Sequence, residues 1–287
     1  MWFARFLKSN ILYIFWFAIY FTIAWFIFGG NLRALIIVAV IYAISISVAL
    51  SPIGEVLLRL VENCREPLTE QEKSYLLPIF EEVYQSAKEI NKNLNSGIKI
   101  YIMDAMYVNA FAIGRKTVAV TKGALETFTE EELKGVLAHE LGHMTYGHTK
   151  ALLLTVIGNF LFSIITFVLR IILRILEFVS KVVALFNVLG IIFTFLTFIV
   201  RIIFEASVFL IQNSSQLFLS INSRSNELIA DKFAYDIGFG DELIKSLYVL
   251  QKISINTKLK ISEKLMASHP HMAFRIAQLE RMENENV

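Results

Sequence analysis

The sequence contains only one cysteine, Cys64, and few charged side chains. A single cysteine excludes an internal disulfide and gives no indication of an oxidising compartment. Charged residues make up 18% of the 287 residues, and the formal net charge of +2 gives no argument for binding nucleic acid. Apolar residues are abundant instead, since 56% of the chain is hydrophobic and 24 residues are Phe. This composition is typical of an integral membrane protein.

Long uncharged runs near the N-terminus account for part of this composition. The first run is Ile11–Phe28 and the second is Ala34–Leu50, and each is long enough to cross a bilayer as a helix. The first run is too long for a cleavable signal peptide, and no small-residue cleavage site follows it. We therefore expect residues 1–50 to form an uncleaved transmembrane hairpin.

A second pair of charge-free runs, Ala151–Leu169 and Val182–Val200, predicts another two membrane crossings within residues 151–211. The segment 170–181 between them carries four charged residues, and we expect it to lie at the membrane interface with its cations reaching the headgroups. The alternative is a buried helix pair in a soluble domain. The distribution of Lys and Arg favours a cytoplasmic location for the polar part of the chain.

The polar segments 51–150 and 212–287 are expected to form the two parts of one catalytic domain. Thr69–Glu72 and Thr129–Glu132 read as capping boxes that begin helices. The alternating stretch from Gly97 to Met103 predicts a strand, and residues 109–121 predict a β-hairpin that turns at Gly114. The expected fold is α+β, mainly α, with four transmembrane helices and a small β-sheet.

The motif HELGH, His139 to His143, places two histidines and a glutamate in little more than one helical turn. Residues four apart lie on the same face of a helix, so the two imidazoles can converge on one point, and Glu140 can face that point from the side. This arrangement suits zinc held by two nitrogens, with a carboxylate placed to take a proton from water. The alternative is a solvated helix with accidental histidines, but with 5 His in the chain such a match is rare.

A zinc site needs a further protein ligand. His148 follows His143 at a spacing that does not fit the three-histidine motif, so we expect it at the surface or at the membrane interface. Glu227 is the better candidate, and Asp231, one turn later on the same helix face, can accept a hydrogen bond from a ligand histidine. The alternative for both carboxylates is an ordinary charged helix face. Glu227 can meet the histidines only if the intervening chain crosses the membrane an even number of times.

Several segments together resemble the HtpX-type membrane zinc metallopeptidases, which are relatives of the CAAX prenyl proteases. The resemblance covers most of the chain and includes the two apolar pairs. Its motifs are VNAFAIG and VAVTKGALE within Val108–Glu126, LAHELGHMTYGH around the histidines, SRSNELIAD at Ser223–Asp231 and SHPHMAFRI at Ser268–Ile276. This order and combination are much more specific than HELGH alone.

The resemblance implies a zincin-type (gluzincin) domain with one zinc ion per chain. The ion would be held by His139, His143 and Glu227, with Glu140 as the general base. The resemblance further implies a multi-pass protein of the bacterial cell (inner) membrane with its catalytic domain in the cytoplasm. Its function would be quality control, through cleavage of misfolded or damaged membrane proteins.

One departure from the family concerns the segment His269-Pro270-His271, where the family usually has His-Pro-Pro. His269 and Arg275 are retained. We expect His269 to hydrogen-bond the oxyanion of the transition state, and the alternative is a plain helix-cap histidine. For His271 we expect a solvated position in the first helical turn.

The expected partners are protein substrates and the lipid bilayer. An extended substrate is expected to pair with an edge strand through main-chain hydrogen bonds, which tolerate many sequences. The strand residues are Asn109, Ala110, Phe111 and Ala112. The alternative there is a purely structural hairpin. Two other functions stay open: a prenyl-protein (CAAX-type) protease, for which the chain shows few spans, and a non-catalytic zinc-bearing membrane scaffold, which would not need Glu140.

Overall fold

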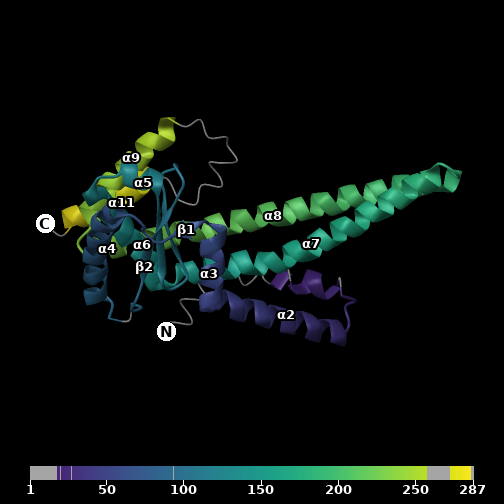
Figure 1. Cartoon of the computed structure of the whole chain (residues 1–287), viewed down its shortest axis with the longest axis horizontal. Helices are drawn as coiled ribbons and strands as arrows, with labels where there is room; N and C mark the ends of the chain where they lie inside the picture. The colour runs from purple at the N-terminus through teal and green to yellow at the C-terminus, as the bar shows by residue number, and fades with distance from the viewer. Residues whose placement is uncertain (1–17, 20, 27, 93, 257–271, 286–287) are drawn as a thin grey trace.

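The computed structural model of the chain describes residues 18–285 except 20, 27, 93 and 257–271. A compact part contains a small mixed sheet surrounded by helices, and a long helical hairpin extends from it (Figure 1). The expected mainly helical α+β fold is confirmed. Half of the predicted first span, Ile11–Phe28, lies outside the described residues, as do His269, Pro270 and His271.

The sheet has the strand order β1-β2-β4-β3. Its strands are β1 (Cys64–Arg65), β2 (Lys99–Met103), β3 (Ala110–Ile113) and β4 (Thr117–Thr121). The two central strands, β2 and β4, are parallel, and both edge strands are antiparallel to their neighbours. The predicted hairpin is confirmed, with Ala110 opposite Val120 and a turn at Gly114, whose φ of +60° glycine adopts without strain. Within the described residues, β3 pairs with β4 alone.

The helices of the described chain are α2 (Leu32–Leu50), α3 (Pro52–Val61), α4 (Glu70–Ile90), α5 (Lys122–Thr127), α6 (Glu130–Tyr146), α7 (His148–Ala184), α8 (Val188–Asp236), α9 (Gly240–Asn256) and α11 (Met272–Glu285). The capping boxes predict the starts of two of them, α4 and α6. The Thr69 side chain accepts from the backbone N–H of Glu72 at the start of α4, and Thr129 does the same with Glu132 at the start of α6. Both boxes are therefore confirmed.

The sheet lies between two layers of helices. On one face, the main core joins α4 and α6 to strand residues such as Ile102 and Val118, and it continues into the end of α8, α9 and α11. On the other face, Ile113 packs with Leu58 of α3 and Leu153 of α7. Helix α6 is buried along most of its length, because α4, α8, α9 and the sheet all contact it. The helix that carries HELGH is thus a central helix of the fold.

Two glycines allow α6 to approach its neighbours closely. A Cβ on Gly135 would lie 2.3 Å from the backbone nitrogen of Leu243 at the start of α9, whereas a Cβ on Gly142 would lie 3.0 Å from Ala230 of α8. We expect Gly135→Ala to lower the free energy of unfolding by about 1–3 kcal/mol, because the backbone of α9 must move. Gly142→Ala should cost less, and thermal unfolding in detergent would measure both. Equal stability of Gly135→Ala and the wild type would contradict this packing.

The second apolar pair differs from its prediction. Helix α7 passes without interruption through the first run and through the charged segment 170–181, and the hairpin turns only at Leu185–Asn187, inside the predicted span Val182–Val200. The predicted start of that span at Val182 is therefore wrong, and segment 170–181 is part of α7 and not a separate connector. Its location at the membrane interface stays a prediction. The charges are accommodated by ion pairs across the hairpin, Arg170 with Glu205 at 2.9 Å and Arg201 with Glu177 at 3.4 Å. The signals of the turn were Asn187, which caps α8, and Gly190, which contacts Ala184 closely.

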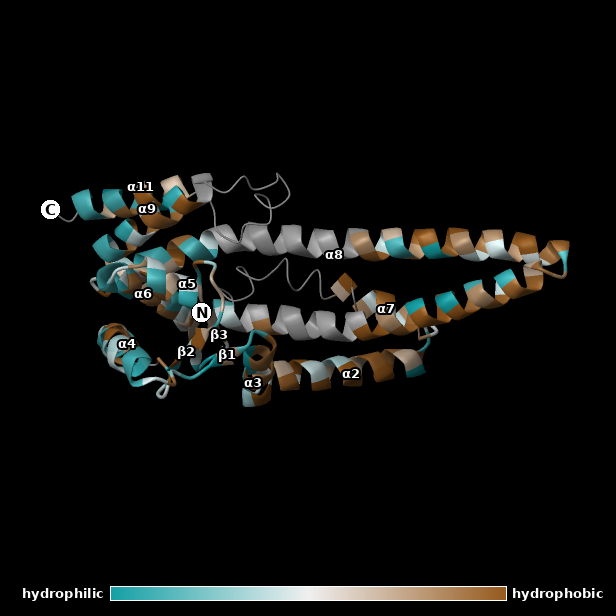
Figure 2. Cartoon of the chain, turned by 45° about the horizontal axis from the view of Figure 1, so that its top comes forward, coloured by the Kyte–Doolittle hydropathy of each residue, from teal (hydrophilic) through white to brown (hydrophobic). Residues whose placement is uncertain are grey.

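Two segments of the described chain are long and apolar enough to cross a membrane, Leu32–Leu50 and Val188–Phe209. Figure 2 shows the apolar colour concentrated along α2 and the far part of the hairpin. Large side chains there are strongly exposed, and Phe186 at the tip is 84% exposed. Such extensive exposed apolar surface marks contact with a membrane or a partner. The segment Val188–Phe209 overlaps the predicted span Val182–Val200 but begins after the turn of the hairpin. The expected number of four membrane crossings stays a prediction.

Candidate metal centre and adjoining cleft

Three side chains from two distant segments converge beside α6. His139 and His143 come from α6, and Glu227 comes from the last part of α8. The two Nε2 atoms are 3.1 Å apart, and the Glu227 oxygens lie 3.3 Å from His139 Nε2 and 3.2 Å from His143 Nε2. His139 and Glu227 are buried, while His143 is half-buried. The structure therefore brings together the residues that the sequence proposed as metal ligands.

This donor set fits a tetrahedral zinc ion. Zinc bonds of about 2.0–2.1 Å place neighbouring ligand atoms roughly 3.3 Å apart in a tetrahedron, close to the distances found among these three residues. When the ring protons are on the outer nitrogens, both Nε2 atoms and the carboxylate present lone pairs to the same small space. Such donors repel one another unless a cation lies between them. The arrangement is suited to holding a metal ion.

The outer nitrogen of His139 belongs to a buried network of charge. Its Nδ1 atom is 2.8 Å from Asp231 Oδ1, and the carboxylate requires this nitrogen to donate a proton. Arg275 of α11 holds both carboxylates, because its Nη2 is 2.6 Å from Asp231 Oδ1 and its Nη1 is 3.0 Å from Glu227 Oε2. Arg275 Nη2 also lies 3.3 Å from His139 Nδ1, but the shorter carboxylate contact decides the position of the proton.

The carboxylates of Glu227 and Asp231 favour a positive charge at the place where the His139 ring and Glu227 meet. Burial and the Arg275 charge both act to lower the pKa of His139, yet Glu227 and Asp231 together raise it to about 9. Burial acts to raise the pKa of Asp231, but the contacts with His139 and Arg275 keep it below its ordinary value. The same preference for positive charge attracts a metal cation.

His148 contacts one of the proposed ligands. It is half-buried, and its Nδ1 atom is 2.9 Å from Nδ1 of His143. Burial, followed by the charge of His143, lowers the pKa of His148 to about 3, so the ring is neutral. His148 is therefore not an exposed surface residue, and its expected place at the membrane interface stays a prediction. His148 does not join the ligand cluster itself, which consists of His139, His143 and Glu227.

Glu140 faces a cleft next to these ligands. The cleft has a volume of about 140 Å³, and Glu140, His139 and Arg275 supply its charged lining. Its apolar wall consists of Val108, Ala110, Phe128, Val136, Leu243, Leu247, Leu250 and Met272. Asn109 also lines it, so two of the four proposed substrate-strand residues lie at the cleft. Of the other two, Phe111 packs against the α3–α7 side of the sheet and Ala112 lies in the main core.

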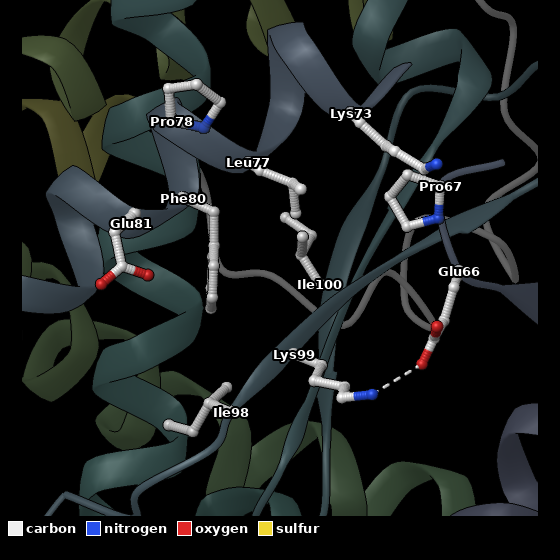
Figure 3. Close-up of a pocket in the computed structure, with 10 residues that line it drawn as sticks. All are labelled: Glu66, Pro67, Lys73, Leu77, Pro78, Phe80, Glu81, Ile98, Lys99 and Ile100. Atoms are coloured by element: carbon white, nitrogen blue, oxygen red, sulfur yellow. Dashed lines mark hydrogen bonds and ion pairs between the residues drawn. The ribbon is translucent and has the colours of Figure 1, made fainter. Parts of the chain in front are cut away.

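A larger cavity, of about 580 Å³, lies away from the ligands. It is formed between α4 and β2, and Figure 3 shows Leu77, Phe80 and Ile100 along it, with the ion pair of Lys99 and Glu66 at one side. None of its lining residues belongs to the ligand cluster or to the cleft. Size alone therefore does not identify the reactive part of this molecule.

Two residues of the site received no role from the sequence. Arg275 was noted only as part of the family motif SHPHMAFRI, although a cation within an apolar helix face was a signal that it is buried with carboxylates. For His148 the signal was Gly147, because a left-handed glycine at the end of α6 turns the chain back toward His143. The geometry of both contacts depends on how the helices pack.

The comparison with protein families gives one match over most of the chain. The model of "Peptidase family M48" matches residues 70–283. Helix α6 and the ligands from α6 and α8 lie within that range, as do His148 and Arg275.

Curated proteins match over shorter stretches. The "Protease HtpX homolog" of Aquifex aeolicus is 46% identical over 67 residues, which is 22% of this chain and 22% of that protein. The "Protease HtpX" of Legionella pneumophila (strain Corby) is 39% identical over 72 residues, or 23% of this chain and 26% of that protein. A homologue in Dictyoglomus turgidum is 41% identical over 87 residues, or 28% of this chain and 25% of that protein. The chain thus matches about a quarter of the length of each relative.

A solved structure has a similar fold. The crystal structure of S. mikatae Ste24p superposes with a TM-score of 0.51 at 19% sequence identity. The match covers 97% of this chain and 65% of that chain. It relates the arrangement of the helical hairpin and the compact part to a known architecture.

Proposed function

The chain belongs to peptidase family M48, and from this membership we propose that it is a membrane-embedded, zinc-dependent endopeptidase. The observation that carries the proposal is the convergence of His139, His143 and Glu227 next to a cleft that Glu140 lines. Two imidazoles and a carboxylate leave one position of a tetrahedral ion open, which distinguishes a catalytic site from a closed structural one. A non-catalytic zinc-bearing scaffold would need no carboxylate at position 140.

The proposed chemistry is hydrolysis of a peptide bond. A bound zinc ion supplies Lewis acidity, which polarises a carbonyl and makes water acidic enough to ionise near neutral pH. Glu140 accepts the proton of the attacking water and passes it to the leaving amine. Arg275 keeps Glu227 and Asp231 in place, and Asp231 orients the His139 ring. For His269 we retain the proposal of a hydrogen bond to the oxyanion.

An extended substrate is proposed to lie along the outer edge of β3. Asn109 and Ala110 reach the cleft there, and β3 pairs only with β4 among the described strands. Main-chain pairing at such an edge accepts many sequences. The apolar wall of the cleft would accommodate an apolar side chain of the substrate.

We propose membrane proteins that are misfolded or damaged as substrates, in keeping with a quality-control function in the cell membrane. This is supported by the two apolar helices and by the direct continuation of α6 through Gly147 into α7. The cleft would therefore lie near the membrane surface, and the bias of Lys and Arg favours its cytoplasmic side. A prenyl-protein protease is the second candidate, because the sequence motifs resemble a family related to the CAAX prenyl proteases.

Proteolysis by the purified full chain in detergent tests the proposal. We expect cleavage of an unfolded protein such as casein, loss of cleavage after 1,10-phenanthroline treatment, and recovery at about one zinc ion per chain. A prenylated C-terminal peptide, supplied in parallel, separates the two substrate classes. Undiminished cleavage by metal-free protein would refute a zinc-dependent enzyme.

A further inference from the structure

The two proposed ligand histidines are held in different ways at their outer nitrogens. His139 Nδ1 faces the carboxylate of Asp231 at 2.8 Å. His143 Nδ1 faces another imidazole instead, since His148 Nδ1 lies 2.9 Å away. The rings of His143 and His148 have centroids 5.1 Å apart and an interplanar angle of 66°, so they meet edge to face and do not stack. The contact between the two Nδ1 atoms is therefore a hydrogen bond between the rings and not a by-product of ring stacking.

His148 is held firmly where it makes this contact. It is the first residue of α7, directly after Gly147, whose φ of 78° ends α6. The next residue, Thr149, is buried and donates its hydroxyl to the carbonyl oxygen of Gly114 in the β3–β4 turn. Leu153, one turn further, is packed under the sheet. The start of α7 is thus fixed to the sheet independently of His143.

The hydrogen-bonding capacity of the two rings decides which one donates. A neutral histidine that binds a metal through Nε2 carries its proton on Nδ1, and that N–H needs an acceptor when it is shielded from water. His148 Nδ1 is the atom in position to accept. It accepts only when the His148 ring is neutral and has its own proton on Nε2.

We propose that His148 is a positioning residue for the metal ligand His143: by accepting the Nδ1–H hydrogen bond, it fixes the tautomer and the rotation of that ring so that Nε2 points at the ion. The inference rests on the proposed function, because it concerns the same zinc site. It assigns His148 neither to the metal nor to the substrate. The proposed ligand His143 of α6 would thus be oriented by the first residue of the next helix, α7.

Zinc affinity of variants at position 148 tests the inference. In the purified full chain, measured by competition with a chromogenic chelator, His148→Ala should bind zinc about 10–100-fold more weakly, the usual loss when such an outer partner is removed. His148→Asn should retain an affinity close to wild type, because its amide oxygen can accept near the position of Nδ1. His148→Leu fills the space without an acceptor and should be as weak as His148→Ala.

A matched control is Tyr146→Leu, which removes the ring that stacks on His148 with centroids 6.1 Å apart but leaves the nitrogen contact intact. Its zinc affinity should equal that of the wild type. The visible absorption of bound Co²⁺ gives a second readout, and we expect the ligand-field bands to change in His148→Leu and to be restored in His148→Asn. Thermal unfolding of the metal-free proteins separates these effects from loss of folding.

The outcomes distinguish this inference from the proposed function. A wild-type chain that binds no zinc defeats the proposed function itself. Wild-type zinc binding with unchanged affinity in both His148→Ala and His148→Leu overturns the inference alone. An affinity of His148→Asn as low as that of His148→Leu overturns it as well, because the acceptor would then be irrelevant. If His148→Ala does not fold, the comparison of Asn with Leu decides.

Discussion

Replacing Glu140 with Gln is expected to reduce peptide hydrolysis by about 100-fold or more while zinc binding stays intact. The amide has nearly the same shape as the carboxylate but cannot take up a proton, and general-base catalysis contributes about 10²–10⁴-fold to such reactions. Zinc binding should persist, because Glu140 lines the cleft and does not belong to the cluster of His139, His143 and Glu227. The measurements are kcat/KM for a protein substrate and the zinc content of the purified chain.

A glutamate on the same helix provides the control. Glu131 lies in the first turn of α6 at the surface and pairs with Lys245 of α9 at 2.7 Å. Glu131→Gln should leave kcat/KM unchanged, since exposed ion pairs contribute little. Wild-type activity in Glu140→Gln would show that another group accepts the proton.

Replacing Glu227 with Ala is expected to remove zinc from the purified protein. The variant loses one of three protein ligands, and the loss should exceed the about 10–100-fold weakening that follows from changes in outer partners alone. It also deprives the buried Arg275 of one of its two carboxylate partners, at 3.0 Å, so that its positive charge is neutralised less completely beside the proposed metal position. Both effects act against a divalent cation. Metal analysis after dialysis and titration with zinc would measure the loss.

Asp236 is the matched control on the same helix. It lies at the end of α8 and pairs with Lys232 at 2.7 Å, away from the ligand cluster. Asp236→Ala should keep the zinc content of the wild type. Unchanged zinc stoichiometry in Glu227→Ala would exclude Glu227 from the ligand set and leave the two histidines without their partner from α8.

The position of Glu227 gives the site an unusual dependence on the hairpin. The histidines precede α7 and the carboxylate lies near the end of α8, so the whole hairpin separates them in the sequence. Close packing of α6 on α8 at Gly142 and Ala230 brings them together again. Changes in how α6 packs on α8 would therefore displace the proposed metal ligands relative to one another.

The long helices also explain where the sequence led to a wrong boundary. Hydropathy and charge define apolar runs, but they do not state where a helix reverses. Arg170 and Glu177 suggested a separate connector, whereas each finds an opposite charge on α8 and remains within the hairpin. The turn at Leu185–Asn187 needed a polar cap and a close approach at Gly190, both weak signals within an apolar run.

The sequence alone determined the local features of this protein. The capping boxes at Thr69 and Thr129, the β-hairpin at Gly114 and the spacing of His139 and His143 depend on residues a few positions apart, so rules of local geometry were sufficient. Only the tertiary structure decided that Arg275 joins Glu227 to Asp231, that His148 faces His143, and that Phe111 points away from the cleft. Those contacts depend on helix packing between distant segments, where displacements of a few ångströms make or break a hydrogen bond.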